Sequence, residues 1–527
     1  MRDRVAFVCN GAEVEVEVEP GESLLSVLRE RLGLVGAKDG CAPQGQCGCC
    51  TVLVDGAPRV ACVTPAQRVA GRSVTTIEGL DGASEFAAAF VATGGSQCGF
   101  CTPGIIMRAA GTRGDLDKAL AAHLCRCTGW QTVYKAIEDR PQGARDFAAA
   151  SARAVLEGGS QHVDASVPLG GGGFADDTAP RDALVAVPGP GMQWVVAPSL
   201  FEARAAAGKV QGRRTTLAEE PPLALSPKPE GGVRLATSWV EPAYLEPDAS
   251  WCIPGGEPAS PLANGGAFGG KERSPVAAAA RALADQYGQP VRVVFAREDV
   301  VRWGPKRAPI SATAVVRNGV VEIEGVVVRG GTTNVWPTVD SVHVQATWTE
   351  VDVMGPPVGR ELRAAGLAEQ AVLIAGALGR DVPVVTPSGA VATARVGIDR
   401  DTGVLTGVEV ELAAGHPLDE VVLRSYAIGA VHMALGWVLT ESIAVDPDTG
   451  EVHDLTIRSF GIIRARDVPP VRVTLVPDDA PARARASDAV FAAVAAATWN
   501  ALARAEGSRP DTFPARDTRT ARLLRRG

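Results

Sequence analysis

The sequence predicts an α+β protein made of several domains. Its 527 residues, at one domain per ~150 residues, correspond to three or four domains. Residues 5–19 alternate between apolar residues and glutamates, as in a half-buried strand, and a short helix is expected from Ser23 to about Gly33. Residues 84–139 follow a helical pattern, and the region after residue 190 mixes strand and helix patterns. These regions indicate a small α+β domain, a helical domain and a mixed α/β region.

The composition argues against two classes of partner. Asp and Glu outnumber Lys and Arg by 60 to 52, which gives a net charge of −8. This charge argues against nucleic acid and against an anionic membrane surface as partners. No stretch reaches the ~18 uninterrupted apolar residues of a membrane helix, and Met1–Arg4 leads into the strand pattern without an apolar signal core. A cytoplasmic location without membrane contact is therefore expected.

The helical region is expected to contain four short helices. Pro103 suits the first turn of one helix, and Asp115 suits the N-terminal cap of another. The predicted helices span residues 85–92, 103–110, 115–124 and 128–138.

The rest of the chain is expected to begin with a linker. Residues 143–185 are rich in Gly, Ala, Pro and Asp, which is typical of an extended connection. Beyond it, strands are predicted at residues 291–295, 312–316 and 320–328, and helices at residues 276–287 and 362–378.

Two Asp-x-Asp-x-Gly segments resemble the start of a calcium-binding loop. They cover residues 399–403 and 446–450. Both place glycine at the fifth position, where a calcium loop needs a ligand. Hairpin turns are therefore predicted at both segments.

Cysteines are the most informative residues of this chain. Of the eleven, ten precede residue 128, and because a reducing cytosol disfavours disulfides, this crowding indicates metal binding. The first group has the order Cys41-x5-Cys47-x2-Cys50, with Cys62 after eleven intervening residues. This is the plant-type ferredoxin pattern with one additional residue in the first gap. A zinc ribbon has two matched C-x2-C pairs, which this group lacks.

A second group of cysteines follows in the helical region. It consists of Cys98-x2-Cys101 and Cys125-x-Cys127. The spacing alone fits zinc or an iron–sulfur cluster, because both take four thiolates.

The residues around both groups resemble the two iron–sulfur domains of xanthine dehydrogenases and aldehyde oxidases. The matching strings are Asp39-Gly-Cys-Ala-Pro-Gln-Gly-Gln-Cys-Gly-Cys-Cys-Thr-Val52, Gln97-Cys-Gly-Phe-Cys-Thr-Pro-Gly104 and Leu124-Cys-Arg-Cys-Thr-Gly-Trp130. The resemblance implies a β-grasp plant-type ferredoxin domain over residues 1–80 and a four-helix domain over residues 81–142, each with one [2Fe–2S] cluster. It assigns one cluster to Cys41, Cys47, Cys50 and Cys62, and the other to Cys98, Cys101, Cys125 and Cys127. Cys9, Cys49 and Cys252 remain as spare thiols.

A glycine-rich string in the second half of the chain reads Asn264-Gly-Gly-Ala-Phe-Gly-Gly-Lys-Glu272. Its spacing is close to a nucleotide-binding P-loop, but Glu272 stands where a Ser or Thr would bind magnesium, which argues against an ATPase. The string resembles the pterin loop of the molybdenum subunit in the same family. This implies that residues 186–527 form a shortened molybdopterin-binding-like domain. By the same resemblance, the cofactor-binding residues are Gln97, Gly265, Gly266, Phe268, Gly269 and Gly270.

The second half also departs from the family pattern. The family carries a Lys-Gly-Val-Gly-Glu segment whose glutamate is the active-site base, and Arg485-Ala-Ser-Asp488 stands in its place. Residues 426–433 replace a Gln-rich pterin loop. The shorter stem of Asp488 moves the carboxylate, and a misplacement of about 1 Å can cost ~100-fold in rate. We therefore assign no catalytic residue and interpret Asp488 as a solvated residue at a helix start. These departures also argue against a bound molybdopterin in this chain.

The resemblance implies an oxidoreductase component. The favoured function is that of an iron–sulfur electron-transfer subunit of a molybdenum hydroxylase, which relays electrons from a molybdenum centre through two clusters to a flavin or other acceptor. The expected partners are molybdenum-binding and FAD-binding subunits in a hetero-oligomer. Two alternatives stay open: a self-contained molybdopterin-dependent hydroxylase of aldehydes or N-heterocycles, and a two-cluster redox sensor or binding module.

Overall fold

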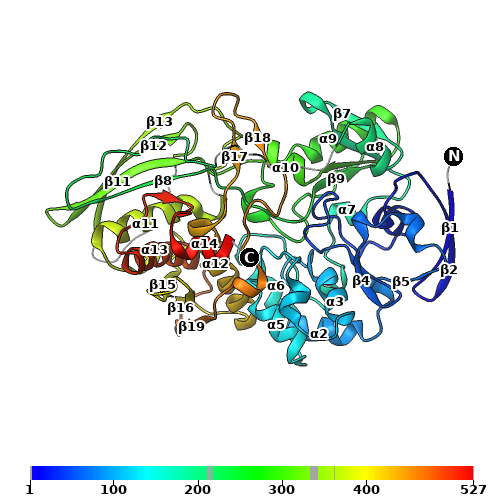
Figure 1. The fold of residues 1–527 in the computed structure, drawn as a ribbon, viewed down its shortest axis with the longest axis horizontal. Helices are drawn as coiled ribbons and strands as arrows, with labels where there is room; N and C mark the ends of the chain where they lie inside the picture. Colours follow the sequence, from blue (N-terminus) through cyan, green and yellow to red (C-terminus); the bar gives the residue numbers. More distant parts are fainter. Residues whose placement is uncertain are drawn as a thin grey trace.

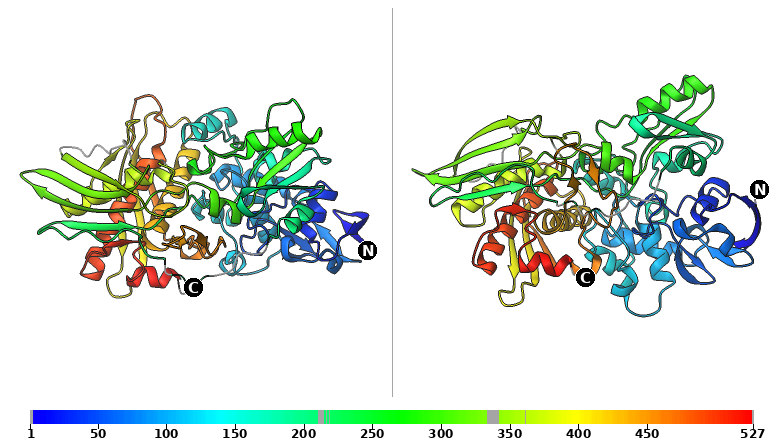
Figure 2. Two further views of the ribbon diagram at one scale, coloured as in Figure 1. Left: turned by 90° about the horizontal axis from the view of Figure 1, so that it is seen from above. Right: turned by 45° about the horizontal axis from the view of Figure 1, so that its top comes forward.

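The fold was analysed in a computed structural model, which describes residues 3–209, 215, 217, 219–332, 342–360 and 362–525. The N-terminal sheet lies at one end of an elongated molecule, and the sheet that contains β11–β13 lies at the other (Figure 1). Both views of Figure 2 show the same separation of the two ends.

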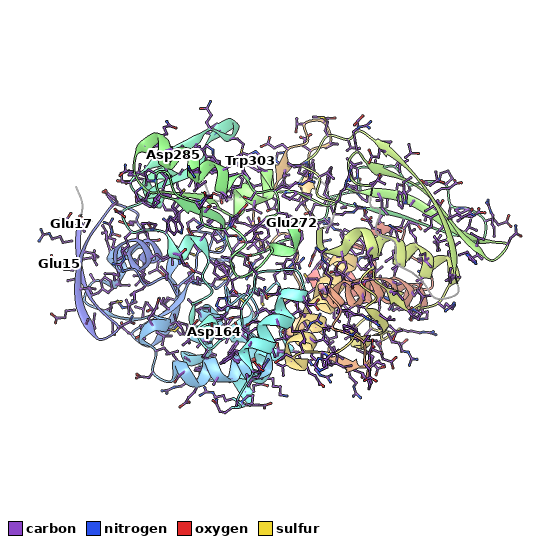
Figure 3. The ribbon with its side chains drawn as sticks, turned by 180° about the vertical axis from the view of Figure 1, so that it is seen from behind. Glu15, Glu17, Asp164, Glu272, Asp285 and Trp303 are labelled. Atoms are coloured by element: carbon purple, nitrogen blue, oxygen red, sulfur yellow. The ribbon has the colours of Figure 1, made fainter. Side chains whose placement is uncertain are left out.

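The N-terminal domain is a five-stranded sheet with the strand order β2-β1-β5-β3-β4. Strand β1 pairs antiparallel with β2 and parallel with β5. Glu15 and Glu17 are exposed on β2 (Figure 3), whereas Val18 is buried, as the alternating pattern predicts. The short helix begins at α1 and continues to Arg31, and Leu24 and Leu28 on it are fully buried. The strands are β1 (Asp3–Cys9), β2 (Ala12–Val18), β3 (Thr51–Val54), β4 (Ala57–Val60) and β5 (Ser73–Thr75), and α1 is Leu24–Ser26.

The second domain contains the four predicted helices. Pro103 lies in the first turn of α3, and the Asp115 side chain caps α4 by accepting a hydrogen bond of 3.2 Å from the Lys118 amide. The helices are α2 (Ala83–Thr93), α3 (Thr102–Ala110), α4 (Leu116–Leu120) and α5 (Gln131–Glu138).

The segment 143–185 is not an extended linker. It contains α6 (Phe147–Leu156) and the single turn α7 (Ala175–Thr178). Asp146 caps α6 by accepting from the amides of two alanines, and the alanine-rich run packs against Val422 of α12 (Glu420–Leu439). The composition that suggested a linker therefore forms a helix, because alanine is both small and the strongest helix former.

The C-terminal half begins with a four-stranded sheet of the order β7-β6-β10-β9. Strand β10 pairs parallel with β6 and antiparallel with β9. The strands are β6 (Leu184–Pro188), β7 (Trp194–Ala197), β9 (Asp248–Cys252) and β10 (Val291–Phe295), and the helices are α8 (Leu200–Ala206), α9 (Val276–Tyr287) and α10 (Arg297–Trp303).

Two larger sheets follow, with the orders β13-β12-β11-β8-β20 and β14-β15-β16-β19. The first contains β8 (Val233–Thr237), β11 (Ile310–Arg317), β12 (Val320–Val328), β13 (His343–Val351) and β20 (Thr512–Phe513). The second contains β14 (Val384–Val385), β15 (Val391–Ile398), β16 (Leu405–Ala413) and β19 (Val471–Leu475). A small hairpin is formed by β17 (Ala444–Val445) and β18 (Val452–His453).

The two Asp-x-Asp-x-Gly segments are hairpin turns, as predicted. Each glycine amide donates a hydrogen bond of 2.8 Å to the carbonyl of the first aspartate, from Gly403 to Asp399 and from Gly450 to Asp446.

Long helices form the core of the C-terminal half. Trp437 and Trp499 are fully buried there and pack edge-on against Phe513. Two of the helices, α12 and α13, are long and apolar enough to cross a membrane by length and composition, but 83% of the apolar window of each is buried inside the fold. They are core helices. The long helices are α11 (Ala365–Leu378), α12 (Glu420–Leu439) and α13 (Ala486–Glu506), and the short helix α14 (Arg519–Arg525) follows them in the chain.

Candidate metal and cofactor sites

The first cysteine group gathers in the loop before β3 and in the turn after β4. Its four cysteines are at most 4% exposed. The Cys41 sulfur accepts hydrogen bonds from the amides of Gln44 at 3.3 Å and Gln46 at 3.5 Å. The Cys50 sulfur accepts one from the Cys62 amide at 3.4 Å. The loop thus surrounds its sulfurs with backbone donors.

The side chains of this group interact with one another. Hydrogen bonds from the thiols of Cys47 and Cys62 hold the pKa of Cys41 well below its usual range. Cys62 also interacts with Cys50, which joins the fourth cysteine to the group. The same contacts raise the pKa of Cys47 and of Cys62 above the usual range of a thiol, so the four side chains form one interacting group.

The second cysteine group lies between the start of α3 and the connection from α4 to α5. The Cys127 sulfur is 3.9 Å from that of Cys98 and 4.0 Å from that of Cys125. Hydrogen bonds from Cys101, Cys127 and Thr128 hold the pKa of Cys125 well below its usual range. The structure therefore brings together the four cysteines that the resemblance assigns to the second cluster.

The placement of the cysteines is compatible with the clusters that the resemblance implies. Among the described residues, no set of three or more His, Cys, Asp or Glu side chains is already arranged around the position of one metal ion. Each iron of a four-cysteine [2Fe–2S] cluster takes two thiolates and completes its shell with sulfide, whereas a structural zinc ion takes four ligands. Both metals that the spacing fits use four cysteines, so the placement alone does not choose between them.

The two cysteine loops contact each other directly. The Leu124 amide, which precedes Cys125, donates a hydrogen bond of 3.0 Å to the Cys47 carbonyl. Cys49 is fully buried next to this contact. One hydrogen bond therefore connects the backbone of a cysteine in the first group to the residue that precedes a cysteine of the second group.

The predicted pterin loop packs against the chain itself. A Cβ on Gly266 would lie 2.8 Å from the Gly158 carbonyl oxygen, and a Cβ on Gly159 would lie 3.1 Å from the Gly266 amide. The Ser160 hydroxyl donates to the Leu262 carbonyl at 2.5 Å. The segment after α6 therefore lies along the glycine loop.

The other predicted cofactor residues lie around the second cysteine group. Gln97 donates hydrogen bonds to the Cys127 carbonyl at 2.9 Å and to the Ser425 hydroxyl at 3.0 Å. Phe268 and Gly269 have left-handed backbone conformations, with φ of 55° and 86°.

Three small cavities run from the second cysteine group toward α13. The first, of about 80 Å³, borders Cys98, Gly265 and Gly266. The second, of about 90 Å³, borders Gln97, Phe268, Gly269, Glu272 and Asp488, and the third, of about 290 Å³, also borders Asp488. Asp488 lies in the first turn of α13, at a helix start as predicted, and is half-buried rather than fully exposed. The start of α13 borders these cavities.

The cavities next to the glycine loop are individually smaller than a cofactor site. Glu157, Gly158 and Tyr426 border both the first and the second cavity, and Asp488 borders the second and the third. Sites for cofactor-sized ligands enclose roughly 300–1,000 Å³, and the first two cavities are well below that range, whereas the third is close to it. The described residues thus place most of the predicted cofactor residues along a series of adjoining cavities.

A buried ion pair that the sequence did not indicate joins the two halves of the chain. Arg126 lies between Cys125 and Cys127 and donates to both oxygens of Glu441, at 2.5 and 2.9 Å. Its Nε also donates to the Pro242 carbonyl at 3.1 Å. Because a buried arginine needs a charged partner, its place between two buried cysteines could have indicated a buried ion pair. The sequence does not show which carboxylate is the partner.

Three family descriptions match parts of the chain. Residues 7–71 match a "2Fe-2S iron-sulfur cluster binding domain", and residues 76–138 match a "[2Fe-2S] binding domain". Residues 309–469 match a "Molybdopterin cofactor-binding domain". The fold and the matches define a class of protein in which two [2Fe–2S] domains precede a molybdopterin-binding domain.

The curated relatives match the N-terminal quarter of the chain. The nicotine 6-hydroxylase small subunit of Paenarthrobacter nicotinovorans is 42% identical over 142 residues, which are 25% of this chain and 86% of that subunit. The xanthine dehydrogenase iron-sulfur-binding subunit of Escherichia coli O157:H7 is 36% identical over 143 residues and is covered to 89%. The aldehyde oxidoreductase of Megalodesulfovibrio gigas is 42% identical over 144 residues, but the match spans 16% of that enzyme. The chain belongs to the xanthine dehydrogenase and aldehyde oxidoreductase family of molybdenum hydroxylases.

Two solved structures share the fold over the whole chain. The aldehyde oxidoreductase from Desulfovibrio gigas has a TM-score of 0.73 at 15% identity and covers 100% of both chains. The aldehyde oxidoreductase from Desulfovibrio desulfuricans ATCC 27774 has a TM-score of 0.72 at 15% identity, over 99% of this chain and 100% of that chain. The predicted α+β multidomain fold is therefore confirmed.

Proposed function

We propose that this chain is the electron-transfer component of a molybdenum hydroxylase complex. The observation that carries the proposal is the presence of two groups of four cysteines, all buried except the half-buried Cys98, in loops that contact each other. One cluster would be held by Cys41, Cys47, Cys50 and Cys62, and the other by Cys98, Cys101, Cys125 and Cys127. When bound, such clusters exchange single electrons.

The residues of the chain serve this role by holding, shielding and connecting the two sites. Burial keeps water from the first site, and the amides of Gln44, Gln46 and Cys62 point at its sulfurs. The hydrogen bond from Leu124 to Cys47 fixes the two loops next to each other. A rigid, dry connection of this kind keeps the distance between two redox sites short.

We propose further that the molybdenum centre and the flavin belong to partner subunits. The small volume of each cavity next to the glycine loop supports a molybdenum centre outside this chain. Two relatives are named as small or iron-sulfur-binding subunits, which supports a hetero-oligomer. The C-terminal half would then serve mainly to dock and hold the iron–sulfur domains.

The alternative is a self-contained hydroxylase that binds its own molybdopterin. The specific observation in its favour is that Gln97, Phe268 and Asp488 border one cavity. The whole-chain likeness to the two aldehyde oxidoreductases is compatible with it but shows the fold alone. Binding would require the segment 157–161 to move away from the glycine loop.

Cysteine variants of the full chain test the two cluster assignments. We expect Cys47→Ser to remove one of two EPR signals seen after reduction and Cys101→Ser to remove the other, because each loses one thiolate ligand. Cys49→Ser is the matched control and should keep both signals, since the proposal gives Cys49 no iron. Loss of a signal in Cys49→Ser, or two intact signals in Cys47→Ser, would contradict the assignment.

A further inference from the structure

We propose that Arg204, on α8 in the C-terminal half, is a positioning residue that sets the reduction potential of the first cluster. It would act through the backbone of the first cysteine loop and not by binding iron. The inference rests on the proposed cluster site of Cys41, Cys47, Cys50 and Cys62.

Arg204 holds one peptide group of that loop from outside the ferredoxin domain. Its Nη2 donates a hydrogen bond of 3.0 Å to the Ala42 carbonyl. The Ala42 amide in turn donates to the Asp39 carboxylate at 3.1 Å. Ala42 is 3% exposed and has a φ of 53°, a left-handed conformation that is uncommon for alanine. Hydrogen bonds with neighbouring side chains therefore fix both the amide and the carbonyl of Ala42, whose backbone conformation is unfavourable by itself.

Ala42 lies in the gap where this chain carries an additional residue. The plant-type spacing has four residues between the first two cysteines, whereas five separate Cys41 from Cys47. The turn at Ala42 leads directly into the amides of Gln44 and Gln46, which donate to the Cys41 sulfur. Hydrogen bonds to cluster sulfurs are one of the factors that set reduction potential, so the position of Ala42 bears on the potential.

Arg204 is itself anchored in the C-terminal half. It forms an ion pair of 2.8 Å with Glu298, in the first turn of α10, and the two side chains are 14% and 3% exposed. A second contact from this half reaches the same loop, because the Arg458 amide donates to the Gln46 side chain at 3.3 Å. The C-terminal half thus forms hydrogen bonds with the first cysteine loop at two points. The two iron–sulfur subunits described above each match a quarter of this chain, whereas Arg204 and Arg458 lie outside its two iron–sulfur domains.

The test is a reductive EPR titration of both clusters in the full chain. In Arg204→Ala, the loop loses its anchor and the amides move from the Cys41 sulfur. We expect the equilibrium constant for one-electron reduction of the first cluster to fall about tenfold, a shift of about 59 mV to a more negative potential. The potential of the second cluster should stay unchanged.

The variant Glu298→Gln distinguishes the positioning role of Arg204 from a direct electrostatic effect on the first cluster. Removing a negative charge near the cluster should by itself favour reduction, so a through-space effect predicts a more positive potential. The positioning role predicts a more negative potential, because Arg204 without its ion-pair partner no longer holds the Ala42 carbonyl. The control is Arg72→Ala, which removes an exposed arginine of the ferredoxin domain that pairs with Asp55.

Unchanged first-cluster potentials in both variants, or a positive shift in Glu298→Gln, would overturn the positioning role. Equal shifts of both clusters would also overturn it, since they would indicate a general loosening of the fold. Iron content and visible absorption of the unmodified chain report separately on the proposed function. Absence of clusters there would reject the function itself, whereas two intact clusters with unmoved potentials would reject only the role of Arg204.

Discussion

At the residue scale, the buried charges decide how the iron–sulfur domains attach to the rest of the chain. Arg126 and Glu441 are 3% and 4% exposed and pair through two hydrogen bonds. Breaking a buried pair leaves one charge without a partner, which costs much more than the pair contributes when intact. Arg126 also lies between two proposed cluster ligands, so disturbance at this pair reaches the metal site.

We expect Glu441→Gln to destabilise the protein by about 3–5 kcal/mol. The neutral amide leaves the Arg126 guanidinium charged and buried next to Cys125 and Cys127. Urea denaturation followed by circular dichroism measures the loss. Asp55→Asn is the control, because its partner Arg72 is exposed and such surface pairs contribute little. Equal small losses in both variants would contradict the importance of the buried pair.

At the residue scale, prediction from the sequence is possible where the chemistry is local. The cysteines could be predicted because their spacing alone indicates metal binding, and the structure brings the eight together in two groups of four. Arg204, Glu298 and Glu441 could not be predicted, because their partners are more than fifty residues away and nothing in the local sequence specifies them.

At the element scale, α12 supports the second cysteine loop by direct backbone contact. Gly429 of α12 faces the Cys127 carbonyl, and a Cβ there would lie 1.8 Å from that oxygen. Ser425, one turn earlier on the same helix, accepts from Gln97 and donates to the Gly94 carbonyl at 2.6 Å. The helix therefore fixes the loop at the point where it approaches the proposed cluster.

We expect Gly429→Ala to lower the melting temperature and the iron content together. The added methyl group forces α12 and the Cys127 loop apart, and such overpacking typically costs about 1–3 kcal/mol. Gly407→Ala is the matched control, since a Cβ on Gly407 would meet only the Pro470 carbonyl at 3.5 Å. Full iron content and an unchanged melting temperature in Gly429→Ala would show that this contact does not support the site.

Elements with strong periodicity could be predicted to the residue. The structure places α9 at Val276–Tyr287, β10 at Val291–Phe295 and β12 at Val320–Val328, as the sequence indicated. The segment 143–185 could not be predicted in this way, because its Gly, Ala and Pro content is shared by linkers and by short helices packed on a neighbour. Its burial depends on contacts with α12 and with the glycine loop, which only the assembled fold provides.

At the scale of the whole molecule, the chain combines two iron–sulfur domains with a molybdopterin-binding-like half whose cavities are small. The fold follows that of the aldehyde oxidoreductases over its full length. Even so, Glu157 and Gly158 border both cavities next to the glycine loop, and each of these cavities is smaller than a cofactor site. For that reason we propose electron transfer rather than hydroxylation for this chain.

Elemental analysis of the purified full-length chain tests this central claim most directly. The account predicts about four iron atoms per chain, as two [2Fe–2S] clusters require, with neither molybdenum nor zinc in stoichiometric amount. Stoichiometric molybdenum would contradict it and support the self-contained hydroxylase. Zinc in place of iron, without visible iron–sulfur absorption, would contradict the cluster assignment itself.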